Sequence, residues 1–460
     1  MDIQLRNTLT KKKEIFKPIE AEKAGLYSCG PTVYGPIHVG NLRAFTLADT
    51  LRRVLEFNGY EVNHVMNITD VGHLVGDGDE GEDKLEVGAK REGKTAWDIA
   101  EFYTDAFKKD VSLMNIAIPD TLPKATDHIE EQIEMIKKLE ENGYAYQISD
   151  GIYFDTSKLE DYGSFGGQKL EEKEEGARVQ VNTEKRQASD FALWKFSPEG
   201  KERHMEWESP WGKGFPGWHL ECSAMSTKYL GKSFDLHTGG IDLIPVHHEN
   251  EIAQTRGAYG TLQANTWVHN DFVQIDGGKM SKSLGNVYNM SDIVEHGFDP
   301  IAFRYFVLGA HYAKKLNFTW EAVGAAQNAL FRLRDTVQEW DLPTGVDKEI
   351  LDRFRMAVND DLDTPQALAI VWDLVGDEHL DTAVKAATLL EFDLVLGLGL
   401  EAFVAKPLEV SLIVQKYLED RAEARLKKNW EDSDRLRDLI LDEGYTIDDA
   451  DDAQTLREKR

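Results

Sequence analysis

A strand, a glycine-bounded turn, a helix and a second strand follow one another near the start of the chain. Residues 25–30 (GLYSCG) are short and bounded by glycine. Residues 42–58 carry apolar side chains at helical spacing and stop at Gly59, and residues 60–69 (YEVNHVMNIT) again have a strand pattern. This order begins a βαβ unit and therefore predicts a parallel sheet. Ligands of open parallel sheets bind at the carboxyl ends of the strands, so residues 29–41 border the first candidate site.

Helical patterns dominate the last third of the chain. Apolar side chains recur every three or four residues after Thr319, which is suited to cap a helix. Thr364 followed by Pro365 predicts a second helix start with proline in the first turn. Residues 341–348 (DLPTGVDK) are typical of a linker, and residues 445–447 of a strand that follows two charged helices.

Size and composition limit the class of protein. With 460 residues the chain has room for about three domains. Hydrophobic residues make up 41% and charged residues 29%, which suffices for several cores and excludes a disordered or low-complexity chain. There is no apolar run of about 18 residues and no signal-peptide pattern, so we expect a cytoplasmic protein that does not enter a membrane.

The net charge of -29 bears on the choice of partner. It results from 53 Lys and Arg against 82 Asp and Glu. Clustered basic side chains bind phosphates, so this excess of acid taken alone argues against a nucleic-acid partner. A local basic stripe can still bind RNA while the rest of the surface repels it, so the question stays open at this level.

Two cysteines, Cys29 and Cys222, are the only ones in the chain. They cannot form a disulfide framework in a chain of this length. They are either buried free thiols or a reactive or metal-bound pair.

Two short segments suit the binding of a polyphosphate. Residues 36–41 (PIHVGN) lie between the first strand and the first helix, where Gly40 lets the backbone approach a ligand and His38 can donate to a phosphate. Residues 279–283 (KMSKS) hold two lysines three residues apart and suit a mobile loop that closes on phosphates. A structural histidine and a solvated basic turn are the alternatives for the two segments taken singly.

Together the two segments resemble the HIGH and KMSKS signatures of class I aminoacyl-tRNA synthetases. Further segments narrow the resemblance to the cysteinyl-tRNA synthetase family, in that family's order and spacing, from about residue 20 to about residue 445. These segments are 29–34 (CGPTVY), 67–70 (NITD), 190–195 (DFALWK), 209–212 (SPWG), 217–225 (GWHLECSAM) and 247–251 (HHENE).

The resemblance implies an α/β fold with a Rossmann-like class I catalytic core that contains a connective insertion, followed by an α-helical anticodon-binding region. The implied domains are a catalytic domain at 1–275 with its insertion at about 75–210, a stem-contact segment with the KMSKS loop at 276–318, a helical bundle at 319–408 and a C-terminal anticodon-binding domain at 409–460.

By motif, the zinc ligands of the family fall on Cys29, Cys222, His247 and Glu251, which implies one Zn²⁺ per subunit. Thiolates, imidazole and carboxylate are reasonable zinc donors. His247 and Glu251 are four residues apart, which puts both on one face of a helix, whereas His248 is expected to point elsewhere and to be supporting or structural. A zinc ion would accept the thiolate of substrate cysteine and disfavour serine.

The resemblance also implies the reaction and its partners. The enzyme would activate L-cysteine with ATP, accompanied by Mg²⁺, and transfer it to the 3′ end of tRNA(Cys), as a monomer. His38 and Lys282 would stabilise the developing pyrophosphate, and Lys279 would support loop closure. ATP-binding positions of the family fall on His38, Gly40, Asn41 and Lys282, and amino-acid-binding positions on Thr69, Trp218, His237 and Asp242.

The chain departs from the family pattern in three places. One is the C-terminal segment 453–456 (AQTL), where the family commonly has an aromatic residue near its last strand. Asn41 replaces the second histidine of HIGH, and it can donate a hydrogen bond but carries no charge, so ATP affinity is expected to differ. Residues 71–84 replace a short Asp-Asp-Lys stretch by a longer segment with an acidic loop at 77–83. Asp434, Arg435 and Arg437 match a charged helix of the family, with a solvated helix face as the alternative.

Two other functions are compatible with the signatures. A related ligase that joins cysteine to an amino sugar shares zinc, ATP and both signatures, but it lacks the anticodon module that the region after residue 318 would provide. An inactive paralogue that only binds tRNA is opposed by the intact His38, Lys279 and Lys282 and by the four zinc-ligand residues.

Overall fold

The computed structural model describes residues 1–72, 84–167, 182–198, 200, 203–408, 410–450 and 453–458. The acidic loop predicted at 77–83 lies outside these residues. The chain divides into two compact units, which are described separately. Unit 1 comprises Met1–Gln327, Lys348–Asp373 and Glu391–Leu398, and unit 2 comprises Asn328–Asp347, Leu374–Leu390 and Gly399–Arg460. This division does not test the domain boundaries predicted at 275, 318 and 408, which stay predictions.

A four-stranded sheet forms the centre of unit 1. Its strand order is β10-β9-β3-β4, and all neighbouring strands are parallel, as the sequence predicts. The bounds are β3 (Lys23–Ser28), β4 (Glu61–Met66), β9 (Phe234–Gly240) and β10 (Ala264–Asn270). The first predicted strand and helix are confirmed with slightly shifted ends, because helix α1 (Val39–Phe57) begins three residues earlier than its apolar spacing indicates.

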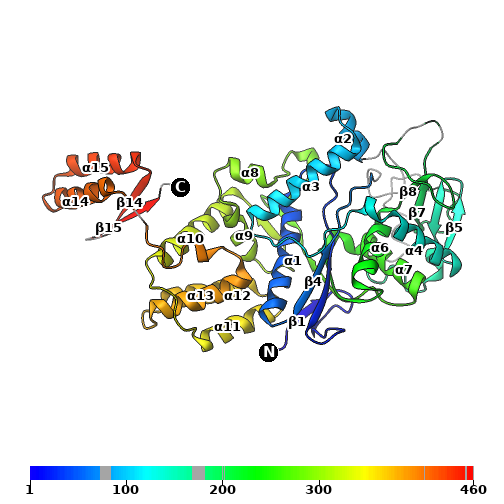
Figure 1. Cartoon of the computed structure of the whole chain (residues 1–460), viewed down its shortest axis with the longest axis horizontal. Coiled ribbons are helices and arrows are strands. Elements are labelled where there is room, and N and C mark those ends of the chain that lie inside the picture. Colours follow the sequence, from blue (N-terminus) through cyan, green and yellow to red (C-terminus); the bar gives the residue numbers. More distant parts are fainter. Residues whose placement is uncertain are drawn as a thin grey trace. The chain divides into compact units, whose positions relative to one another are not determined.

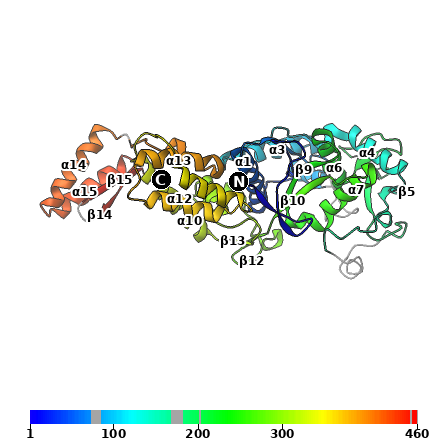
Figure 2. The same cartoon turned by 90° about the horizontal axis from the view of Figure 1, so that it is seen from below.

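Helices cover this sheet on both sides. Figure 1 shows α1 on one side of the strands and α6 (Trp218–Leu230) on the other, and Figure 2 shows the same order from below. The buried side of α1 carries Leu42, Phe45 and Leu51, which are at most 3% exposed. Burial of each such side chain stabilises the fold by ~1.5–3 kcal/mol, so this helix is firmly held on the sheet.

The order of the strands creates a binding crevice. Helix α1 connects β3 to β4 in one direction, whereas α7 (Glu249–Tyr259) connects β9 to β10 in the other. The chain thus turns in opposite directions from the neighbouring strands β3 and β9. Ligands of open α/β sheets bind where the strand order reverses in this way, outside the carboxyl ends of the strands.

Residues 67–217 interrupt the sheet between β4 and α6. They form a second sheet, which is antiparallel and has the order β5-β6-β7-β8. Helices precede this sheet, and helix α4 packs on α6 and α7. The elements of this insertion are α2 (Lys84–Glu92), α3 (Ala96–Leu113), η1 (Ala125–His128), α4 (Ile129–Glu141), β5 (Ala145–Ile148), β6 (Gly151–Phe154), η2 (Thr156–Lys158), β7 (Phe191–Phe196) and β8 (Gly214–Pro216).

The KMSKS segment belongs to a small sheet that follows β10. Strand β11 (Val273–Ile275) pairs antiparallel with β12 (Gly278–Lys279) and parallel with β13 (Leu316–Phe318). The other elements of unit 1 are the hairpin β1 (Gln4–Asn7) and β2 (Lys12–Ile15), the turns η4 (Ile241–Leu243), η5 (Ile244–His248) and η6 (Lys282–Leu284), and helices α8 (Met290–Glu295), α9 (Pro300–Leu308) and α11 (Lys348–Asn359).

The remaining helices agree with the predicted pattern. Helix α10 (Trp320–Gln338) starts after Thr319, whose hydroxyl accepts the N–H of Ala322 at 3.0 Å, so the predicted cap is confirmed. The helix start at Thr364 is also confirmed. The elements from there to the end are α12 (Thr364–Gly376), α13 (Thr382–Leu396), η7 (Leu400–Ala402), α14 (Leu412–Leu426), α15 (Trp430–Asp442), β14 (Tyr445–Ala450) and β15 (Ala453–Glu458). Among the helices that the structure describes, none is both long and apolar enough to cross a bilayer.

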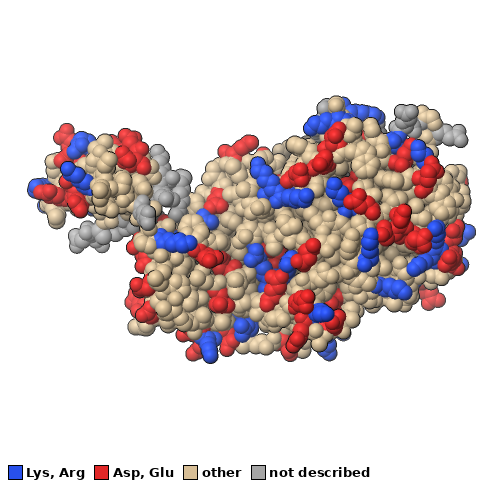
Figure 3. Space-filling view, viewed as in Figure 1, with Lys and Arg blue, Asp and Glu red and all other residues tan. Residues whose placement is uncertain are grey.

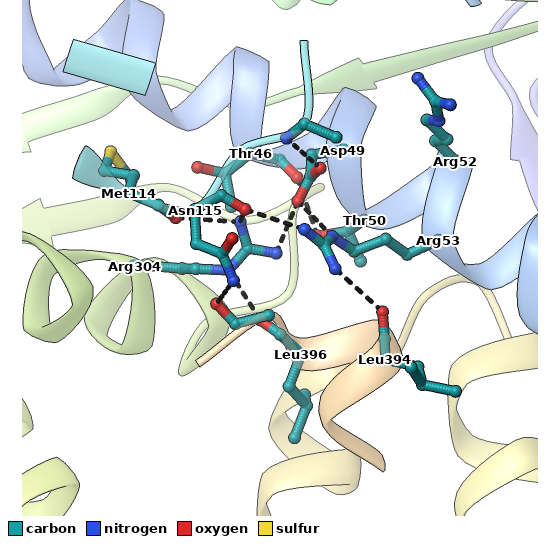
Figure 4. Close-up of polar contacts among 12 residues, drawn as sticks. Thr46, Asp49, Thr50, Arg52, Arg53, Met114, Asn115, Arg304, Leu394 and Leu396 are labelled. Carbon is teal, nitrogen blue, oxygen red and sulfur yellow. Dashed lines mark hydrogen bonds and ion pairs between the residues drawn. The ribbon is translucent and has the colours of Figure 1, made fainter. Parts of the chain in front are cut away.

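A buried ion pair anchors α1 within unit 1. Asp49 lies 2.6 Å from Arg304 of α9, and both side chains are at most 1% exposed (Figure 4). The Arg304 guanidinium also donates to the carbonyls of Leu396, Met114 and Asn115. Removal of one partner of such a pair leaves a buried charge and costs ~3–5 kcal/mol, so the pair fixes α1 against these segments.

Candidate active site

The crevice at the carboxyl ends of β3 and β9 brings sulfur and nitrogen side chains together. Cys29 directly follows β3, and β9 carries His237 and ends in two glycines. A Cβ at Gly240 would lie 2.3 Å from Asp242 Oδ1, so only glycine allows the Asp242 carboxylate to fold back onto this strand end.

The four predicted zinc ligands form one cluster. The ligand atoms of Cys29, Cys222, His247 and Glu251 all lie within 4.8 Å of one another. They come from the end of β3, from α6, from the turn η5 and from α7. His247 Nε2 is 3.0 Å from Glu251 Oε1, and Glu251 has no exposed surface. The fold therefore assembles a thiol pair, an imidazole and a carboxylate from four separate elements.

The local backbone differs from the single helix that the sequence predicts. Residues 244–248 form one wide π-helical turn before α7 begins at Glu249. Such turns are rare and recur at functional sites. His248 does not point away from the cluster, as the sequence argument expects, because its Nε2 lies 3.2 Å from Cys29 Sγ. Its other nitrogen, Nδ1, lies 2.8 Å from His269 Nε2.

A second set of residues overlaps with the first. The ligand atoms of Cys29, His237, His248 and Glu251 also lie within 4.8 Å of one another. The sequence argument missed His248 in this set, because a four-residue spacing on a regular helix selects only His247 as the partner of Glu251. Knowledge of the π-helical turn would have been needed to find it.

The HIGH-type segment caps helix α1. The N–H of Asn41 donates to His38 Nδ1 at 3.2 Å, and the N–H of His38 donates to Asn41 Oδ1 at 3.1 Å. This reciprocal pair is a capping box. Because Nδ1 of His38 accepts a hydrogen bond, the proton of the neutral ring is on Nε2. A Cβ at Gly40 would lie 3.1 Å from Met280 Cε, so glycine also allows the KMSKS segment to approach.

Residues shortly after the KMSKS segment are joined to the start of α1. The N–H of Val39 donates to the carbonyl of Tyr288 at 2.9 Å, and His38 and Asn289 form an isolated antiparallel bridge. Lys279 lies at the end of β12 and is exposed, and Lys282 begins the turn η6. The side chain of Lys282 is outside the described part of the chain. The structure thus connects the HIGH-type segment, through the backbone, to the stretch that follows the KMSKS segment.

Comparisons with known proteins agree with this geometry. A family model described as the tRNA synthetases class I (C) catalytic domain matches residues 15–328. Cysteine–tRNA ligase 1 of Burkholderia lata is 50% identical over 457 residues, which cover 99% of this chain and 97% of that protein. The chain belongs to the cysteine–tRNA ligase family.

Further relatives support the fold of this cysteine–tRNA ligase family member. The cysteine–tRNA ligase of Treponema denticola is 41% identical over 483 residues, which cover 98% of each protein. Mycobacterium tuberculosis methionyl-tRNA synthetase in complex with methionyl-adenylate has a TM-score of 0.54 at 17% identity, and the match covers 82% of this chain and 90% of that one. Because the two sequences are only 17% identical, the similarity to the methionyl-tRNA synthetase concerns the fold alone. It confirms the predicted class I architecture.

Burial and charged neighbours shift the pKa values of the four predicted zinc ligands in opposite directions. Burial raises the pKa of the Cys29 thiol well above its usual value, whereas a hydrogen bond from Cys29 lowers the pKa of the Cys222 thiol. Burial acts to lower the pKa of His247, but attraction to Cys222 and Glu251 outweighs it and raises this pKa to about 10. Attraction to His237 and His247 overcomes the burial of Glu251 and holds its pKa well below the usual range.

The four predicted amino-acid-binding residues lie in different settings. The rings of Trp218 and His247 lie tilted against each other, with centroids 4.6 Å apart, and the hydroxyl of Thr69 accepts from Asn67 at 2.9 Å. Asp242 is exposed in η4. His237 has no exposed surface, and its Nε2 lies 2.9 Å from Glu251 Oε2, so its ring supports the carboxylate.

Proposed function

We propose that this chain is a cysteine–tRNA ligase, which activates L-cysteine with ATP and transfers it to the 3′ end of tRNA(Cys). The observation that carries the proposal is the cluster of Cys29, Cys222, His247 and Glu251 at the crevice, in a member of this family. We further propose that the protein acts in the cytoplasm as a monomer.

The donor set of the cluster fits one Zn²⁺ per subunit. Thiolates, an imidazole and a carboxylate are its usual ligands. His247 Nδ1 lies 2.9 Å from His219 Nδ1, which leaves Nε2 facing the cluster. Metal-bound histidines are commonly held through the second ring nitrogen in this way. When bound, zinc would supply a soft acceptor for the thiolate of substrate cysteine, for which the hard hydroxyl of serine is a poor replacement.

The side chains around the cluster would orient the amino acid. Trp218 beside His247 would close the pocket, and Thr69 and Asp242 would hold the polar groups of cysteine near the strand ends. His237 would act through Glu251, which it contacts directly.

The two signature segments would bind ATP, accompanied by Mg²⁺. His38 is oriented by Asn41 so that Nε2–H can donate to a phosphate oxygen, and Gly40 lets the nucleotide approach the backbone. Lys282 would bring positive charge to the leaving pyrophosphate, together with His38, and Lys279 would support the closure of the loop. Positioning and charge stabilisation of this kind can supply most of the rate enhancement.

The reaction would take place in two steps. An oxygen of the cysteine carboxylate attacks the α-phosphorus of ATP, and the bond to the β-phosphate breaks with release of pyrophosphate. The terminal ribose hydroxyl of the tRNA then attacks the carbonyl carbon of cysteinyl-adenylate. AMP leaves, and the hydroxyl proton passes to a base or to water.

A charging assay distinguishes this function from the alternatives. We expect the protein to acylate tRNA(Cys) with labelled cysteine and ATP, and not to join cysteine to an amino sugar. Formation of the amino-sugar product without charged tRNA would contradict the proposal in favour of the related ligase. Binding of tRNA without any activation of cysteine would contradict it in favour of the inactive paralogue.

A further inference from the structure

The two carboxylate oxygens of Glu251 have different surroundings. Oε1 faces the cluster, 3.0 Å from His247 Nε2 and 3.9 Å from Cys29 Sγ. Oε2 accepts hydrogen bonds from His237 Nε2 at 2.9 Å and from Gln263 Nε2 at 3.0 Å. One oxygen is therefore turned toward the proposed metal ion, and the other is held by the protein.

Gln263 is fixed by the surrounding elements. It immediately precedes β10 and is 1% exposed. Its backbone carbonyl accepts the N–H of Phe234, the first residue of β9, at 2.9 Å. Its side-chain amide donates to Ser226 Oγ of α6 at 2.9 Å as well as to Glu251 of α7. The side chain of Gln263 thus ties the carboxylate of α7 to α6, and its backbone is fixed at the start of β9 and β10.

The orientation of this amide follows from its partners. An ionised carboxylate can only accept, so the Gln263 atom that faces Glu251 must be the nitrogen. The hydroxyl of Ser226 donates to the carbonyl of Ser223 at 3.2 Å, so its oxygen is also available as an acceptor of Gln263 Nε2.

This orientation of the Gln263 amide carries a free-energy cost at its carbonyl oxygen. Gln263 Oε1 is buried and has no hydrogen-bond partner among the described residues. An unpaired buried carbonyl costs ~1–3 kcal/mol. The hydrogen bond to the Glu251 carboxylate offsets this cost, because bonds to charged groups are the stronger ones.

We propose that Gln263 is a positioning residue that, together with His237, makes Glu251 a one-oxygen ligand of the metal ion. The inference rests on the proposed function, since it concerns the same zinc site. Because both donors engage Oε2, only Oε1 is open to an ion. The carboxylate then occupies one coordination position and leaves room for the thiolate of substrate cysteine.

Two glutamine variants test this role. Gln263→Met keeps the length of the side chain but cannot donate. Gln132→Met is the matched control, because Gln132 is equally buried and its Nε2 also has two acceptors, the carbonyls of Ala125 at 3.0 Å and His128 at 3.1 Å. The zinc affinity of each purified full-length protein is measured by competition with a chromogenic chelator, and the thermal unfolding of each metal-free protein is recorded.

We expect Gln263→Met to bind zinc about 10- to 100-fold more weakly than the wild type, which is the range for partners of metal ligands. Gln132→Met should lower the unfolding temperature and leave zinc affinity unchanged. Equal zinc affinity of the wild type and Gln263→Met would overturn the inference while the proposed function stands. A folded wild type that binds no zinc would overturn both.

A second variant keeps the test valid if Gln263→Met does not fold. Gln263→Asn retains the polar amide but is one methylene too short to reach Glu251 Oε2. We expect a stable protein with weakened zinc binding. An asparagine variant with wild-type zinc affinity would overturn the inference.

Discussion

Asn41 replaces the second histidine of the HIGH-type motif and closes the first turn of α1 with its side chain. Its Oδ1 accepts the N–H of His38, while its own N–H fixes the His38 ring. The residue is therefore both a helix cap and a neighbour of the proposed ATP phosphates. From the sequence alone, the missing charge of Asn41 can be predicted but its capping role cannot. Capping depends on the backbone angles at His38.

Replacement of Asn41 by aspartate separates these two roles. Asn41→Asp keeps the acceptor for the N–H of His38 and puts a negative charge at the helix N-terminus, so we expect unchanged or higher thermal stability. The same charge would repel ATP, and the KM for ATP should rise about 10-fold, which corresponds to roughly 1.4 kcal/mol of lost binding. Thermal unfolding and ATP-dependent pyrophosphate exchange measure the two effects. A wild-type KM for ATP would show that Asn41 does not face the nucleotide.

For single residues, the candidate site could be predicted from the sequence only where the residue belongs to a motif. The motif residues Cys29, Cys222, His247 and Glu251 do lie together. Gln263 has no such signal, because its contact with Glu251 joins two elements across a turn. The roles assigned to Thr69 and Asp242 stay predictions.

At the scale of elements, Arg43 links α1 to the small sheet that carries the KMSKS segment. Its guanidinium is 1% exposed. Burial lowers its pKa to about 10, so it is still charged at neutral pH. Among the described residues, its acceptors are all backbone carbonyls. They precede β11 and β13 and belong to Asp271, Phe272, His311, Tyr312 and Lys314.

Arg43→Lys should disturb this link. A lysine has three donors on one nitrogen and cannot satisfy the same set of carbonyls, so we expect a loss of ~2–4 kcal/mol of stability. Because the strand that leads to Lys279 would shift, the KM for ATP should rise about 10-fold or more, while the KM for cysteine stays unchanged.

Arg304→Lys is the matched control for this prediction. Arg304 is also fully buried and also holds α1, but through Asp49 and the segments around Asn115 and Leu396 (Figure 4). This variant should lose comparable stability and keep its KM for ATP. Equal rises in KM for the two variants would contradict a specific role of Arg43.

Asp449 holds together the elements at the end of unit 2. Its carboxylate accepts from Arg421 of α14 at 2.9 Å and from Arg437 of α15 at 2.5 Å, and it pairs with Arg425 at 2.8 Å. The hydrogen bonds from Arg421 lower the pKa of Asp449 to about 2. Arg437, which matches a charged helix of the family by sequence, thus has a partner within this unit.

Asp449→Asn should destabilise this unit by ~1–3 kcal/mol at neutral pH. Since the pKa of Asp449 is lower in the folded than in the unfolded state, its contribution is present above about pH 4 and is lost as pH falls through about 2. Hydrogen exchange of α14 and α15 should therefore differ between variant and wild type at pH 7 and converge at low pH. Asp434→Asn, at an exposed partner of Arg437, should have little effect.

Several elements were predictable because their signals are local. The apolar spacing of α1 and the Thr319 cap of α10 are examples. The turn at 244–248 was not predictable, because a π-helical turn has the residue spacing of neither a regular helix nor a strand. Strand β15 was missed because it depends on pairing with β14.

At the scale of the whole molecule, the acidic net charge did not identify the partner. On the face of unit 1 that Figure 3 shows, basic and acidic side chains are interspersed among uncharged residues. The net charge of a protein affects its solubility and association, but it carries little information about a local binding site. The parallel sheet, in contrast, was predictable from one βαβ unit, because the crossover connection restricts the possible topologies.

The most direct test of the central claim is cysteine-dependent ATP–pyrophosphate exchange, measured before and after removal of zinc. We expect exchange with cysteine but not with serine, loss of exchange on chelation, and recovery when zinc is returned. Because thiol selection depends on the metal in this account, exchange that survives complete removal of zinc, or that serine supports equally well, would contradict it.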